Sequence, residues 1–87
     1  MPQVKKKHED QLNDIIMNLR EVSEDKSVPR NVKLRIDEIL GILQDNAERS
    51  IKVNKVLHFL DEIADDANLE PYTRTQIWNI VSMLEKV

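Results

Sequence analysis

Apolar residues recur at steps of three and four along most of this chain, the spacing that places side chains on one face of an α-helix. Four such stretches, at about 9–23, 29–44, 48–65 and 71–87, are separated by short polar breaks. No segment alternates apolar and polar residues as a half-buried strand does, and the β-branched residues fall at helical spacing. The sequence therefore predicts an all-α protein with four amphipathic helices.

The first and last breaks carry a proline at a similar place. Pro29 and Pro71 fall where the next helix should begin, a position that tolerates proline because its missing N–H would be unpaired there. Ser27 and Asn68 precede them and are candidates to cap these helices with side-chain oxygens. Gly41 lies inside the second stretch, where glycine costs about 1 kcal/mol relative to alanine, and it suggests a close approach between helices.

The second half of the chain repeats the first. The stretch 60–84 aligns with 19–43, and the breaks between helices also coincide in this alignment. A period near 40 residues built from two helices is typical of a helical-hairpin repeat. The identical pairs are Leu19 and Leu60, Glu21 and Glu62, Asp25 and Asp66, Ile36 and Ile77, Ile39 and Ile80, and Leu43 and Leu84.

Short connections make successive helices antiparallel neighbours. Two architectures fit: a closed up-and-down four-helix bundle, or a two-unit piece of a helical solenoid. Because stable solenoids need about three repeats, we expect the closed bundle, or a dimer that completes it. The 87 residues form a single domain, with a flexible basic tail at 1–8 and hairpins at about 9–44 and 48–87.

The composition limits what the chain can do. It holds no cysteine, which excludes a disulfide framework, a thiolate metal site and a cysteine nucleophile and fits a reducing cytosol. No apolar run approaches the roughly 18 residues of a membrane span, and the N-terminus lacks the apolar segment of a secretory signal. We therefore expect a cytoplasmic protein that is not in a membrane.

The acidic segment 61–70 is the richest candidate for a metal site. Asp66, Asn68 and Glu70 resemble the start of a calcium loop, but its sixth and twelfth positions hold Pro71 and Ile77 rather than glycine and glutamate. A solvated helix end explains this cluster better. We expect no metal.

Enzymatic chemistry finds little support. His8 and His58 lack the glutamate three residues earlier that a di-iron bundle site needs. One glycine rules out a glycine-rich phosphate loop, and no serine has a histidine at a suggestive spacing for nucleophilic catalysis. We expect no catalytic residue and no cofactor, and hence a protein that is not an enzyme.

Nucleic-acid binding is the alternative function. Lys5, Lys6 and Lys7 form a short basic run, and Arg49 and Lys52 lie three residues apart on one helical face. The net charge of −3 and the acidic residues among these cations weigh against it, since nucleic-acid-binding domains are usually basic. These five residues would make the contacts of a nucleic-acid- or ribosome-associated accessory protein.

Protein binding is the favoured function. Trp78 lies at the edge of the apolar stripe in the last helix, and it can be either the rim of the core or an interface anchor. Tryptophan, tyrosine and arginine are the usual anchors of protein interfaces, so Tyr72, Arg74 and Trp78 are the candidate interface residues. We expect a small interaction module that binds a protein partner or its own copies.

Two stretches resemble an uncharacterised protein family of small archaeal helical proteins. They are LDEIADDANLEPYTRTQIWNIVSMLE at 60–85 and VPRN at 28–31, with TRTQIWNIVS at 73–82 the most specific part. The resemblance covers most of the chain and is strongest in its second half. It implies an up-and-down four-helix fold and an archaeal cytosol, and it supplies no activity, ligand or functional residue. The repeat unit also resembles a HEAT-type hairpin in a more general way.

Overall fold

A computed structural model describes the backbone of residues 3–87 and the side chains of residues 11–87. It contains four α-helices, which are α1 (Gln3–Glu24), α2 (Arg30–Leu43), α3 (Arg49–Ala64) and α4 (Pro71–Glu85). The predicted all-α chain is confirmed, and the helix ends from α2 onward agree with the pattern to within two residues. Within the described part of the chain, no helix is both long and apolar enough to cross a membrane.

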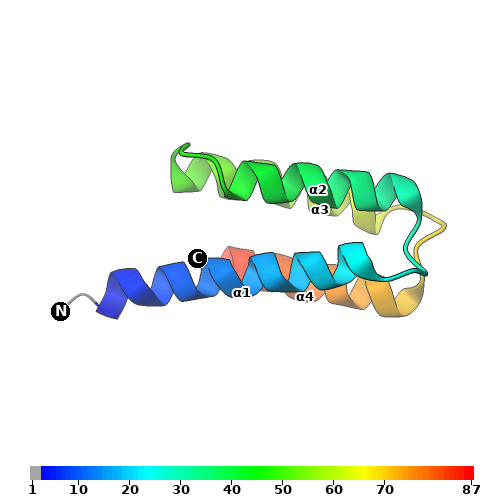
Figure 1. Cartoon of the computed structure of the whole chain (residues 1–87), viewed down its shortest axis with the longest axis horizontal. Coiled ribbons are helices and arrows are strands. Elements are labelled where there is room, and N and C mark those ends of the chain that lie inside the picture. Colours follow the sequence, from blue (N-terminus) through cyan, green and yellow to red (C-terminus); the bar gives the residue numbers. More distant parts are fainter. Residues whose placement is uncertain (1–2) are drawn as a thin grey trace.

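The helices form a closed ring of antiparallel neighbours. Each helix packs on two others, α1 on α2 and α4, and α3 on α2 and α4, while the described backbones of the diagonal pairs come no closer than 8 Å between Cα atoms. Both hairpin turns lie at one end of the bundle, and the connection from α2 to α3 lies at the other (Figure 1). This arrangement confirms the up-and-down bundle built from two similar hairpins.

Helix α1 starts earlier than its apolar stripe indicates. The sequence predicts a start near residue 9 after a flexible tail, whereas the structure places residues 3–8 in the helix. Glutamine and lysine are good helix formers, and neither glycine nor proline interrupts this segment. Helical propensity therefore extends the element beyond the part that packs on the core.

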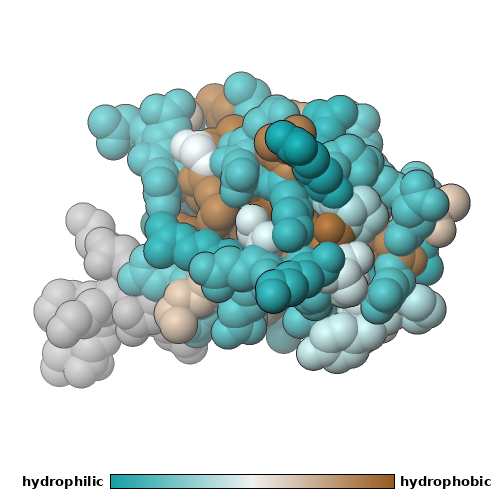
Figure 2. Space-filling view, turned by 45° about the vertical axis from the view of Figure 1, so that its right-hand side comes forward, coloured by the Kyte–Doolittle hydropathy of each residue, from teal (hydrophilic) through white to brown (hydrophobic). Residues whose placement is uncertain are grey.

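The core runs along the axis of the bundle. On the face seen in Figure 2 the surface is mostly hydrophilic, and hydrophobic residues show mainly in the seam between the upper and lower helices. Thr73 is the one polar side chain buried with the core among the described residues. The buried apolar residues are Ile15, Leu19, Val22, Val28, Val32, Ile36, Ile39, Leu43, Val56, Leu60, Ile63, Ala64, Leu69, Ile77, Ile80 and Leu84.

Gly41 does not mark a close approach between helices, so that prediction is wrong. The residue is exposed, and a Cβ atom added to it would meet no heavy atom within 4 Å. The reason lies in the helical period, because a residue two positions from both Ile39 and Leu43 points away from the face they share.

The two hairpin turns are built alike, but not by the predicted caps. Asp25 Oδ1 accepts hydrogen bonds from the Ser27 backbone N–H at 2.9 Å and from its hydroxyl at 2.8 Å. Asp66 Oδ1 accepts one from the Asn68 backbone N–H at 2.9 Å. Neither α2 nor α4 has a side-chain cap. Ser27 and Asn68 are thus wrong as caps, because an aspartate two residues earlier folds each turn through their backbone.

Candidate functional site

Arg74 holds two helices together. Its Nε donates to the Ala64 carbonyl oxygen at 3.0 Å, and its Nη2 donates to the Asp66 carbonyl oxygen at 3.0 Å. The Ala64 carbonyl belongs to the last turn of α3, where no intrahelical N–H remains to pair with it. The Asp66 carbonyl lies in the turn that follows and also accepts the Leu69 N–H at 3.2 Å. The guanidinium of this predicted interface residue therefore closes the turn from α3 to α4.

Tyr72 and Trp78 lie on different flanks of α4. Six residues separate them, which places them about 120° apart around the helix. Tyr72 is 68% exposed and lines the groove between α1 and α4. Trp78 is 45% exposed and follows Arg74 by one helical turn, on the flank that faces α3. The structure thus does not bring Tyr72, Arg74 and Trp78 together as one patch.

A groove of about 680 Å³ lies between α3 and α4. Glu85 on its rim follows Trp78 by seven residues, so both lie on the same flank of α4, about two turns apart. We call Trp78 and this groove the α3–α4 surface. Half of its lining is aliphatic, and the rest includes one cation and one anion. The lining residues are Arg49, Ser50, Val53, Asn54, Leu57, Leu84, Glu85 and Val87.

A second groove of about 420 Å³, the α1–α4 groove, lies on the opposite flank of α4. Its polar lining is uncharged, and Gln76 Oε1 is buried there without a hydrogen-bond partner among the described residues. The Asn18 Nδ2 atom lies 3.6 Å from the Met83 sulfur across the groove. The lining consists of Asn18, Val22, Tyr72, Thr75, Gln76, Asn79, Ile80 and Met83.

Sequence reasoning missed this second groove. The polar positions of α4 recur at steps of three and four, as its apolar positions do. This second, polar stripe indicates the wall that α4 contributes to the groove. The helical period does not tell which helix lies next to α4, so it could not predict that Asn18 of α1 lines the opposite wall.

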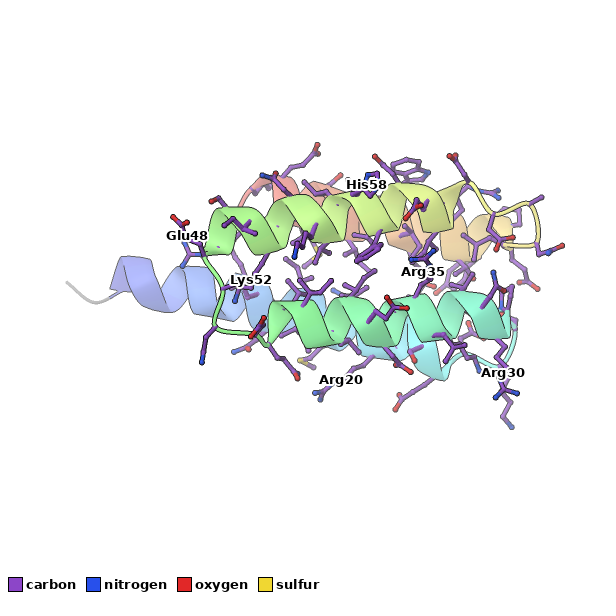
Figure 3. All side chains as sticks on the ribbon, turned by 90° about the horizontal axis from the view of Figure 1, so that it is seen from above. Arg20, Arg30, Arg35, Glu48, Lys52 and His58 are labelled. Carbon is purple, nitrogen blue, oxygen red and sulfur yellow. The ribbon has the colours of Figure 1, made fainter. Side chains whose placement is uncertain are left out.

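Arg49 and Lys52, the two predicted nucleic-acid residues whose side chains are described, do not form a free basic surface. Lys52 Nζ donates to the Leu43 carbonyl oxygen at 3.2 Å and to the Asp45 carbonyl oxygen at 2.9 Å, where α2 and α3 are joined (Figure 3). Arg49 is exposed and lines the same groove as Glu85. The side chains of Lys5, Lys6 and Lys7 lie outside the described residues.

The carboxylates with shifted pKa values serve the turns. A hydrogen bond from Asn31 Nδ2 at 2.9 Å is the largest cause that lowers the pKa of Asp66, followed by the Asn68 N–H. The two hydrogen bonds from Ser27 lower the pKa of Asp25. Such shifts favour the charged form at neutral pH, so these groups are suited to hold the turns rather than to transfer protons. Nowhere in residues 11–87 do three His, Asp or Glu side chains lie close enough together to hold a metal ion.

A third and smaller depression lies between α2 and α3. It has a volume of about 170 Å³ and is lined in part by Arg35, Asn31 and Asp66. The guanidinium carbon of Arg35 lies 5.4 Å from the ring centroid of Phe59, which is within cation–π range. Figure 3 shows Arg35 between the two helices. These polar groups hold α2, α3 and the last turn together.

Comparison with known proteins agrees with the fold and assigns no function to the candidate site. The sequence model of an uncharacterised protein family (UPF0147) matches residues 2–87. The UPF0147 protein MJ1419 of Methanocaldococcus jannaschii is 38% identical over 80 residues, which cover 91% of this chain and 86% of that protein.

Two crystal structures are also similar to this bundle. A protein of the uncharacterised family UPF0147 from Thermoplasma acidophilum has a TM-score of 0.85 and 33% identity, covering 90% of this chain and 93% of that one. A protein of unknown function, MMP1188, has a TM-score of 0.84 and 38% identity, covering 90% of each chain. The resemblance to an archaeal family of four-helix proteins is therefore confirmed.

Proposed function

From the premise that this chain belongs to the uncharacterised protein family UPF0147, we propose that it is a non-enzymatic protein-interaction module of the cytoplasm. Its docking site is the α3–α4 surface. The observation that carries the proposal is Trp78, which remains 45% exposed on the same flank of α4 as a groove whose lining is half aliphatic.

The energy available at Trp78 is large for a single residue. A tryptophan buries about 150–250 Å² when it is fully covered, so covering the exposed part would remove on the order of 70–110 Å² from water. At about 25 cal/mol per Å², this contributes about 2–3 kcal/mol. Such a gain corresponds to roughly a 30- to 150-fold tighter dissociation constant.

The groove suits the apolar face of a partner's amphipathic helix. Val53 and Leu57 lie one turn apart on α3, and Leu84 and Val87 lie about one turn apart near the end of α4. These aliphatic pairs offer contacts for the i, i+3, i+4 and i+7 anchors on the apolar face of a bound helix. The charges of Arg49 and Glu85 on the rim offset each other, which favours a protein over a polyanion.

The test is retention of partners by tagged protein from its native cells, washed at low and high salt. We expect a protein partner that survives high salt, because apolar contacts are not screened. Trp78→Ala should lose it, while Tyr72→Ala, which removes an exposed aromatic from the other flank, should keep it. The melting temperature of each variant shows that the comparison is made on folded protein.

Two results would contradict the proposal. One is nucleic acid retained only at low salt, which would favour the lysine-based alternative. The other is a protein partner that Trp78→Ala holds as tightly as the unaltered chain. Sedimentation equilibrium of the pure chain distinguishes self-association from binding of another protein.

A further inference from the structure

We propose that the α1–α4 groove is a second binding site, which takes an extended peptide segment through its main chain. It lies on the flank of α4 opposite the α3–α4 surface and does not depend on that surface. Its floor is apolar, from Val22, Ile80 and Met83, and its walls are polar.

Three primary amides give the groove its chemistry. Asn18 comes from α1, and Gln76 and Asn79 come from α4. A primary amide offers an N–H donor and a carbonyl acceptor, the same pair that a peptide group presents. Gln76 and Asn79 can therefore each pair with one peptide group of a bound segment, and Asn18 offers its Oδ1 acceptor while its Nδ2 donates to the Met83 sulfur at 3.6 Å.

Gln76 shows that the groove lacks a donor. Its Oε1 is buried and has no hydrogen-bond partner among the described residues. A buried acceptor left unpaired is destabilising, and native proteins hold few of them. A peptide N–H in the groove would supply the missing donor once the Gln76 amide turns from its covered position toward the bound segment.

The charges around the groove select against polyanions. None of the lining residues carries a charge, so no lysine or arginine is present to neutralise a phosphate. Asp14 and Glu21 are exposed, and they lie four residues before and three residues after Asn18 on the same flank of α1. The favoured segment is thus uncharged at its centre, and a lysine or arginine is favoured toward either end, near Asp14 or Glu21.

The groove has the length of a short peptide. From Tyr72 to Met83 the axis of α4 rises about 16 Å, at about 1.5 Å per residue. An extended chain advances about 3.3 Å per residue, so about five residues span this distance. Alternate side chains of such a segment would point at the apolar floor.

The experiment selects hexapeptides from a random display library on the full chain. Selected sequences are made as acetylated, amidated peptides, and their dissociation constants are measured by titration. The side-chain amide signals of Asn18, Gln76 and Asn79 are followed by NMR. We expect these signals to shift, and we expect methylation of the central peptide nitrogens to weaken binding at least tenfold.

Matched variants separate this site from stability and from the proposed docking surface. Gln76→Met removes the acceptor at similar volume, so it should weaken the selected peptides at least tenfold while the melting temperature stays level or rises by about 4 °C. Ser82→Ala, on the exposed face of α4, and Trp78→Ala should leave peptide affinity unchanged. The proposal is overturned if no peptide is enriched, if N-methylation has no effect, or if hexathymidylate binds as tightly as the peptides.

Discussion

Replacing Gly41 by alanine should stabilise the bundle. Gly41 lies within α2, is exposed and has no positive φ angle. A Cβ atom at this position meets no heavy atom within 4 Å, so alanine adds no clash. The substitution lowers the backbone entropy of the unfolded chain and leaves the native contacts as they are.

The expected gain is about 1 kcal/mol, the difference between glycine and alanine inside a helix. For a domain of this size, that raises the melting temperature by about 4–8 °C. Thermal and urea unfolding followed by circular dichroism at 222 nm measure it, and the urea m-value should stay unchanged.

A larger side chain gives the matched control. Gly41→Leu should also stabilise, because leucine is a good helix former and the position is open to solvent. If α2 instead approached another helix at Gly41, leucine would overpack the contact and destabilise by about 1–3 kcal/mol. Loss of stability in either variant would refute the exposed placement of this residue.

Three further predictions concern the turns and the core. Because the folded-state pKa values of Asp25 and Asp66 are lowered, their stabilising effect should be complete above the unfolded pKa near 4 and lost as the pH falls through the folded values. Asn substitutions should remove that part of the acid dependence, as measured by urea titrations from pH 2 to 7. Arg74→Ala should destabilise by about 1–3 kcal/mol, because the Ala64 carbonyl loses its donor and the Asp66 carbonyl keeps only the Leu69 N–H, and an unchanged urea midpoint would contradict this. Leu60→Ala in the core should cost about 2–5 kcal/mol, whereas Ile51→Ala, with its side chain 48% exposed, should stay within about 0.5 kcal/mol; equal losses would contradict the placement of the core.

The fold was predictable because the apolar residues that recur at helical spacing in the sequence are the residues that form the core. Ile36, Ile39, Ile77 and Ile80 fall on equivalent faces of α2 and α4, so the repeat in the sequence is also a repeat in space. Each hairpin buries its apolar face only by packing it against the other hairpin, and few arrangements of four helices achieve this. The exposed side of Gly41 could have been read from the same period.

The turns were harder to predict because several polar residues compete there. Ser27 and Asn68 have the composition of caps, but Asp25 and Asp66, two residues earlier, bond to their backbone N–H groups. Short polar side chains commonly cap a helix, and they commonly fold a turn by bonding to the backbone N–H two residues later. One feature of the sequence did indicate the role of the two aspartates in the turns, because an aspartate stands at the same position in both repeats.

The surfaces depended on which helices are neighbours. The helical spacing of α4 places Trp78 at the edge of the apolar stripe, and a side chain at such an edge is expected to be about half buried. Placing Tyr72 on the α1 side and Arg74 on the α3 side required the order of the helices around the bundle. Without that order, three anchor-type residues on one short helix look like one patch.

The most direct test of the docking proposal uses the single tryptophan of the chain. Protein carrying 5-fluorotryptophan gives one ¹⁹F signal, which reports on Trp78 alone. Adding the protein retained at high salt should shift or broaden this signal in proportion to the bound fraction. A signal that stays unchanged when the partner is fully bound would contradict docking at the α3–α4 surface.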